Sequence, residues 1–440
     1  MNCFVKVTCG LLLLIATLIA TSAYAVEFKD GSRARDALTK QVKMMFEKKR
    51  FAELDAMAEK FRENKSRFPD GSWKLQVFYT GFDLSTNTPE WAFPMYISKA
   101  EDWRRTRPTS VTAQCVLAKA WMDYAWQERG GGYAGEVKEK SWDLVHERLD
   151  KAWKIVNEPL APGVGDCPNR LNLRLRLAKA MGIEREDFEA LFLEAKRQEP
   201  GYYQHYAVKA DYLTPRWHGE EGDWQQFITK VADQNPQGEG ASIYTRVAWS
   251  MYFGNEWKDF QGSGIYWDRM KTGFKEIEHN YPDSPWILNT FAMFACRADD
   301  LESMTALFKR IDAGLYYPEA WGKDSADDCR KWVKLGKTKF EVNNELIAEN
   351  HRRFQEGLFK NLLELAEKGN RKILGSLYEK YLKGQGTTAD PVAAYAWLLQ
   401  DETTYKEQIA TTAKSLTPEQ LRQAQEKAEV LRRRIARQNK

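Results

Sequence analysis

The side chains best placed for chemistry gather in one polar loop between aromatic-rich segments. The loop holds an imidazole and three carboxylates, groups that coordinate cations or act as general acids and bases. Aromatic rings flank it, and flat rings with a polar handle stack on sugars or grip peptides. Carboxylates at a helix start are more often simply solvated and favoured by the helix dipole, and packing explains most aromatic side chains, so both interpretations stay open. The candidate ligand-binding residues are Tyr212, Trp217, His218, Glu220 and Glu221, with Asp223 closing the loop.

Two helices must position this loop. The first, Tyr202–Leu213, ends at Thr214-Pro215, because a proline pushes the residue before it out of the α region. Asp223 stands where an N-cap belongs, and the apolar residues after it recur at helical spacing. The loop is therefore predicted to join two helices of a longer helical array.

The sequence motifs of common enzymes and cofactor sites are incomplete or absent in this sequence. A G-x-G-x-x-G match beginning at Gly130 follows a helix, whereas a dinucleotide site needs a strand before it. The phrase Gly336–Thr338 resembles the end of a phosphate loop, but Lys331 stands where that loop needs glycine. H-E-x-x-H, G-x-S-x-G and S-x-x-K do not occur. We therefore predict no catalytic residue, no metal site and no cofactor.

The first 25 residues have the pattern of a segment that directs export and is then removed. Lys6 supplies a positive charge, Leu11–Ala20 an apolar core, and Ala23–Ala25 a small-x-small cleavage site. Cleavage is predicted between Ala25 and Val26, and no later stretch of the sequence is long and apolar enough to span a membrane. We expect a protein exported to the periplasm of a Gram-negative bacterium, or secreted.

The charge balance argues against nucleic acid as a partner. The formal net charge is only +4 over 440 residues, whereas nucleic-acid binding needs a strongly basic stripe. Hydrophobic residues make up 43% and charged residues 29% of the chain, which suits a folded protein rather than a disordered one.

Helices that end before prolines recur in the middle of the chain. Pro200, Pro236 and Pro282 follow amphipathic helices at intervals of 36 and 46 residues, and an aromatic-bearing helix follows each one. Such a period is typical of a tetratricopeptide-like solenoid, in which each helix pair buries its apolar face against its neighbours. The predicted fold class is all-α, a tetratricopeptide-like helical repeat array (α-solenoid). Trp73–Phe82 reads as a strand or a buried helix, so at most a minor strand element is expected near residues 73–82.

The chain divides into five predicted regions. They are a signal peptide over residues 1–25, an N-terminal helical region over 26–158, tetratricopeptide-like repeats over 169–335, a linking helix over 336–368, and a final repeat with a C-terminal helix over 369–440.

Two parts of the sequence resemble known families. The phrases RFPDGSWKL (Arg67–Leu75), LTPRWHG (Leu213–Gly219) and NTFAMFACRADD (Asn289–Asp300) together resemble the domain-of-unknown-function family 4034. That resemblance would cover about residues 30–335 and implies a bacterial, mostly helical domain. The family carries no established activity, so the resemblance transfers no catalytic residue.

The C-terminal part is similar to a Sel-one-like repeat. The matching residues are Leu374–Tyr378 (LGSLY), Gly384, Gly386, Asp390, Ala394 and Trp397, with the tail from Leu416. Tyr381–Lys383 departs from the pattern by about three extra residues before the turn. The resemblance implies a helical hairpin that acts as a protein–protein scaffold.

Four cysteines remain once the export segment is removed, and an even number is compatible with disulfides in an exported protein. Solenoid repeats contact mainly their sequence neighbours, which favours Cys296–Cys329 as one bridge and Cys115–Cys167 as a second. Cys296 lies in an apolar helix, where a free thiol also packs as a small hydrophobe.

Two functions from different classes fit these patterns. The first is a non-enzymatic scaffold that mediates protein–protein interaction in the bacterial envelope, supported by the repeat pattern and the missing nucleophile signatures. The second is a glycan-binding or glycan-cleaving envelope protein, motivated by the aromatic residues and the acidic loop Glu220–Asp223. The expected partner is a protein, with an envelope glycan as the alternative.

Overall fold

The computed structural model describes residues 31–84, 88–131, 137–234, 239–282 and 284–438 of the chain. The predicted export segment, with its cleavage site between Ala25 and Val26, lies outside the described residues. By its own contacts the chain divides into unit 1, which ends at Arg330, and unit 2, which begins at Lys331. No helix in the described part of the chain is both long enough and apolar enough to cross a membrane.

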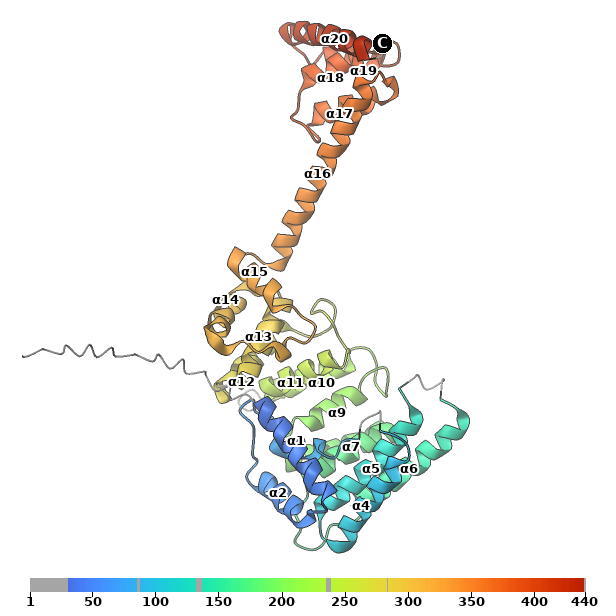
Figure 1. The fold of residues 1–440 in the computed structure, drawn as a ribbon, viewed down its shortest axis with the longest axis vertical. Helices are drawn as coiled ribbons and strands as arrows, with labels where there is room; N and C mark the ends of the chain where they lie inside the picture. The colour runs from blue at the N-terminus through green and yellow to red at the C-terminus, as the bar shows by residue number, and fades with distance from the viewer. Residues whose placement is uncertain (1–30, 85–87, 132–136, 235–238, 283, 439–440) are drawn as a thin grey trace, which may run out of the picture. The chain divides into compact units, whose positions relative to one another are not determined.

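Unit 1 is a succession of helices (Figure 1). They are α1 (Gly31–Glu47), α2 (Phe51–Glu63), α3 (Lys74–Thr80), α4 (Ala92–Thr106), α5 (Val111–Arg129), α6 (Glu139–Asn157), α7 (Pro168–Met181), α8 (Arg185–Gln198), α9 (Gln204–Tyr212), α10 (Asp223–Gln234), α11 (Gly240–Phe253), α12 (Trp267–Asn280), α13 (Pro285–Arg297) and α14 (Leu301–Arg310). The short turns η2 (Ile311–Leu315) and η3 (Pro318–Ala320) follow, and α15 (Ala326–Leu335) runs across the division between the units.

Most helices of unit 1 pack on their neighbours in sequence. The run α10, α11, α12, α13 and α14 packs pairwise in that order, as do α4 with α5, α5 with α6 and α7 with α8. The N-terminal helices depart from this order, because α3 also contacts α7 and α2 contacts α5. Pairwise stacking of this kind is how helical repeats bury apolar faces that no single pair can cover.

Prolines end the helices where the sequence predicts. Glu199 follows α8 and Tyr281 follows α12, and both have left the helical region of backbone angles just before Pro200 and Pro282. Their ψ values of 83° and 61° reflect the crowding that a proline ring imposes on the residue before it. Pro236, the other proline of the predicted pattern, lies outside the described residues.

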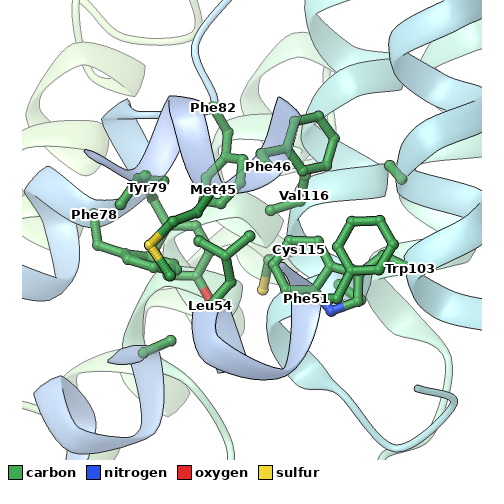
Figure 2. Close-up of a cluster of buried hydrophobic side chains, with 14 of the residues drawn as sticks. Met45, Phe46, Phe51, Leu54, Phe78, Tyr79, Phe82, Trp103, Cys115 and Val116 are labelled. Carbon is green, nitrogen blue, oxygen red and sulfur yellow. The ribbon is translucent and has the colours of Figure 1, made fainter. Parts of the chain in front are cut away.

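An aromatic cluster holds the N-terminal helices together (Figure 2). The rings of Phe51 and Trp103 stack with centroids 5.2 Å apart, and Phe46 meets Phe82 edge-on at 5.5 Å. Offset and edge-to-face ring pairs add about 0.5–1.5 kcal/mol each beyond their buried area. Helix α3 lies inside this cluster and is buried on most of its surface.

The all-α prediction is confirmed, since most of the described residues are helical and none of them forms a strand. The run Trp73–Phe82 adopts the helical alternative as α3. Arg67 and Trp73 make one isolated antiparallel bridge just before it.

After the end of α15, unit 2 continues with the long helix α16 (Lys339–Glu367). Thr338 and Glu341 form a reciprocal capping box at its start. The short turn η4 (Arg371–Ile373) and four helices follow: α17 (Leu374–Lys383), α18 (Pro391–Leu398), α19 (Lys406–Ala413) and α20 (Pro418–Gln438). Helices α17 and α18 pack as a hairpin, and the Asp390 carboxylate caps α18 by accepting from the Ala393 amide at 2.8 Å.

Candidate functional site

The aromatic residues at the start of the predicted loop are joined to neighbouring helices. The Tyr212 hydroxyl donates to the Ile183 carbonyl at 3.0 Å, and its ring stacks on Phe188 with centroids 3.8 Å apart. Burial raises the pKa of this hydroxyl. His218 lies beside the Tyr212 ring at 4.7 Å, and its Nε2 is 3.0 Å from the Lys179 carbonyl oxygen of α7.

Trp217 lies between α5 and α7. Its ring meets Trp126 edge-on at 6.0 Å, and the Lys179 ammonium stands 4.2 Å from its ring centroid. Burial lowers the pKa of that Lys179 ammonium, although Asp211 beside it acts in the opposite direction. The Trp217 indole N–H is buried and bonds to no described residue, so this ring retains an unused donor.

Among the described residues, the hydrogen bonds and ion pairs of the loop carboxylates do not include this aromatic group. Glu220 and Glu221 are exposed, and the Asp223 carboxylate accepts from the Glu220 amide at 3.2 Å. Arg185 lies 3.3 Å from Asp223. The described residues contain no group of three or more His, Cys, Asp or Glu side chains placed to hold a metal ion. The structure thus brings Tyr212, Trp217 and His218 together, and their ligand-binding role remains a prediction.

A second site lies elsewhere in unit 1, as a pocket of about 340 Å³ that we call the tryptophan pocket. It forms where α1 and α3 meet α9, α11 and α13. Its lining combines two indoles, two guanidinium groups and one carboxylate with small polar and apolar side chains. The lining residues are Arg35, Asp70, Ser72, Gln76, Val77, Tyr203, Arg246, Trp249, Ser250, Trp286 and Ile287.

A tight turn before α3 supplies the acidic wall of the pocket. The Asp70 carboxylate accepts from the Ser72 amide at 3.0 Å and from the Ser72 hydroxyl at 2.6 Å, and it forms an ion pair with Arg35 of α1. An aspartate that bonds the backbone two residues ahead stabilises such a turn. The negative charge of Asp70 is therefore already neutralised inside the protein.

Gly71 lets α11 approach this turn. Its φ of +77° lies in the left-handed region that favours glycine, and a β-carbon there would overlap Arg246 and Tyr281. The close approach allows the Arg246 guanidinium to donate to the Asp70 carbonyl at 2.9 Å. No described carboxylate lies within 4.0 Å of Arg246 in an ion pair.

The opposite wall is aromatic. Trp249 and Trp286 are half-buried, with ring centroids 6.3 Å apart and planes inclined by only 24°. The Arg35 guanidinium carbon is 5.4 Å from the Trp286 ring centroid, and Arg246 is 5.1 Å from that of Tyr203. The pocket therefore offers flat apolar surfaces next to a cationic group, an arrangement typical of ligand pockets.

The sequence did not point to the tryptophan pocket. Its lining comes from five places in the chain, so no local spacing marks it. A partial signal was present, because the phrase Arg67–Leu75 that suggested a family resemblance contains Asp70, Ser72 and the glycine between them.

The cysteines follow the predicted pairing in part. Cys296 and Cys329 form a disulfide across 33 positions of sequence. The second predicted bridge is not formed, since Cys115 and Cys167 are free buried thiols. They lie in the apolar core with the Tyr79 hydroxyl 3.5 Å from the Cys167 sulfur, where thiols pack as small hydrophobes.

Comparisons with known proteins give a partial family match. The sequence model of a domain of unknown function, DUF4034, matches residues 38–152, from α1 into α6. No curated protein matches the chain. A solved structure of c5321, a protective antigen present in uropathogenic Escherichia coli strains displaying an SLR fold, is 16% identical and covers 88% of this chain and 96% of its own. Its TM-score is 0.19, at which the likeness carries no structural argument.

Proposed function

We propose that this protein is an exported, non-enzymatic helical-repeat scaffold that binds a segment of a partner protein in the tryptophan pocket. The observation that carries the proposal is that two half-buried indoles lie in one pocket with Arg246, whose guanidinium forms no ion pair within 4.0 Å with a described carboxylate. Aromatic and arginine side chains dominate the binding energy of most protein interfaces.

The chemistry of the pocket defines the kind of segment that it suits. An apolar or aromatic side chain can pack against the indoles, and a neighbouring carboxylate can pair with Arg246. The Asp70 charge does not oppose that carboxylate, because Arg35 already neutralises it. The hairpin of α17 and α18, which resembles a Sel-one-like repeat, supports the scaffold reading for unit 2.

Export to an envelope compartment is part of the same proposal. It rests on the pattern of residues 1–25. The disulfide between Cys296 and Cys329 supports it, because disulfides persist in oxidising compartments outside the cytoplasm.

The test is capture of partners from envelope extract with the form that starts at Val26, compared across variants. Trp249→Ala and Arg246→Gln should each weaken capture of a protein partner about 30-fold or more, the effect of losing a residue worth ~2 kcal/mol. Trp91→Ala is the matched control, since Trp91 is 69% exposed and lies outside the pocket.

Three outcomes separate the competing readings. Equal capture by wild type and both pocket variants contradicts the proposal. Loss of the partner in Trp217→Ala, with Trp249→Ala unchanged, assigns binding to the loop of Tyr212, Trp217 and His218 instead. A partner that survives protease but is removed by glycan hydrolases indicates the glycan alternative.

A further inference from the structure

The charged side chains of α16 lie on one half of the helix surface, and the other half is uncharged. At 100° per residue, every Asp, Glu, Lys and Arg between Glu341 and Glu367 falls within one half of the helical wheel. These residues are Glu341, Glu345, Glu349, Arg352, Arg353, Glu356, Lys360, Glu364 and Glu367. The other half carries apolar residues, asparagines, one glutamine and one histidine.

A heptad pattern runs along the centre of the uncharged half. Its residues alternate at intervals of three and four: Asn344, Ile347, His351, Phe354, Leu358, Asn361 and Leu365, which we call the α16 seam. A 3.5-residue repeat keeps the same face toward a partner when two helices supercoil. All seven residues are exposed, including Ile347 and Phe354 at 65% each. The seam is about 32 Å long.

Unit 2 uses a different stripe of α16 for its own core. Phe359, Leu362, Leu363 and Ala366 pack against the cluster formed by α17, α18 and α20. The seam residues are absent from that cluster, so the fold of unit 2 leaves them uncovered.

Part of the charged half of α16 is engaged in ion pairs. Glu349 pairs with Arg352 and with Arg353 at 2.8 Å, and Lys337 pairs with Glu345 at 2.6 Å. The seam itself carries no Asp, Glu, Lys or Arg, so a charged partner surface would gain no ion pair from it. The face that matches an uncharged, heptad-spaced seam is the same seam on an identical helix.

We propose that α16 pairs with α16 of a second copy of this chain, as a short parallel coiled coil. In a parallel, in-register pair Asn344 and Asn361 each lie opposite their own equivalents, so neither seam asparagine faces an apolar side chain. The remaining apolar seam residues, Ile347, Phe354, Leu358 and Leu365, supply the buried surface.

Sedimentation equilibrium of the form that starts at Val26 tests the association. The wild type should have twice the mass of one chain, and Ile347→Lys should halve it. Leu346→Lys is the matched control, since Leu346 is a neighbouring residue of similar exposure, 58%, that lies on the charged half. Unchanged far-ultraviolet circular dichroism in both variants shows that α16 remains folded.

The proposal fails if the wild type is monomeric, if Ile347→Lys leaves the mass unchanged, or if Leu346→Lys disrupts the dimer equally. Orientation is tested by Ile347→Cys with a mild oxidant, which leaves both seam asparagines in place, since Cys115 and Cys167 are buried. A covalent dimer on a non-reducing gel supports the parallel register, and a non-covalent dimer without that product overturns it.

Discussion

His205 couples the stability of unit 1 to pH. The side chain is fully buried in α9, and neither ring nitrogen bonds to any described residue. Burial lowers its pKa to about 3, whereas an exposed histidine titrates near 6.5. Between these values the unfolded chain binds a proton that the folded chain does not, so stability falls as the pH drops from about 6.5 toward 3.

This residue alone should remove about 2 kcal/mol of unfolding free energy between pH 7.5 and pH 5. Urea unfolding at both pH values measures it. His205→Gln should flatten the pH dependence, and replacing the exposed His279 by Gln should not. A steep dependence that persists in His205→Gln would show that another group is responsible.

Asp300 joins two helices through one carboxylate. It caps α14 by accepting from the Ser303 amide at 2.9 Å, and it accepts from the Trp267 indole and the Lys271 ammonium of α12 at 2.8 Å each. Burial opposes the charged form, but the bonds from Lys271, Ser303 and Trp267 prevail and lower the pKa of Asp300. Its stabilisation is therefore complete above about pH 4 and is lost only in stronger acid.

Asp300→Ala should lower the unfolding free energy by about 2–4 kcal/mol. The substitution removes the cap of α14 and leaves the Trp267 and Lys271 donors of α12 without their acceptor. Thermal and urea unfolding at neutral pH measure the change. Asp268→Ala, in the exposed first turn of α12, is the control and should cost about 0.5 kcal/mol or less. Equal losses in the two variants would refute the joining role.

At the scale of elements, a glycine without a side chain, Gly273, allows α12 to lie close to α11. A β-carbon on Gly273 would overlap the Ala241 carbonyl and the Thr245 hydroxyl of α11. Gly273→Ala should therefore destabilise unit 1 by about 1–3 kcal/mol. Gly357 of α16 has open space around it, and Gly357→Ala should stabilise its helix by about 0.5–1 kcal/mol. Denaturant unfolding of both variants checks the opposite signs.

Helix ends were predictable because proline and capping residues act locally. Thr214-Pro215, Glu199-Pro200 and Tyr281-Pro282 each end a helix, and Asp223 begins one. The run Trp73–Phe82 was ambiguous for a physical reason: α3 buries Leu75, Val77 and Tyr79 but also Phe78 between them. A short helix buried on nearly all sides shows no period that distinguishes it from a strand.

At the scale of the whole molecule, the tryptophan pocket is a site that could not be predicted from the sequence. Arg35, Asp70, Arg246 and Trp286 are tens to hundreds of positions apart, and only the packing of α1 and α3 on the middle helices brings them together. The loop residues Tyr212, Trp217 and His218 were found because they are near in sequence. Local sequence patterns identify the loops that connect helices, whereas pockets depend on long-range contacts.

The two cysteine pairs differ in a way that thiol counting detects. The denatured, unreduced form that starts at Val26 should show two reactive thiols, Cys115 and Cys167. Reduction should expose two more and lower the unfolding free energy by about 3–4 kcal/mol, since the bridge closes a loop of 33 positions. Four thiols without reductant would exclude the bridge, and none would show that both pairs are oxidised.

The position of that bridge has a mechanical consequence. Cys329 is the residue before Arg330, the last residue of unit 1. Tension applied to the chain from Lys331 onward therefore passes through the sulfur atoms into α13, where Cys296 lies. The intervening segment, which includes α14, η2 and η3, carries none of that load while the bridge is intact. A pull on unit 2 thus meets a helix in the packed interior of unit 1, and cannot unwind the last turns of that unit one after another.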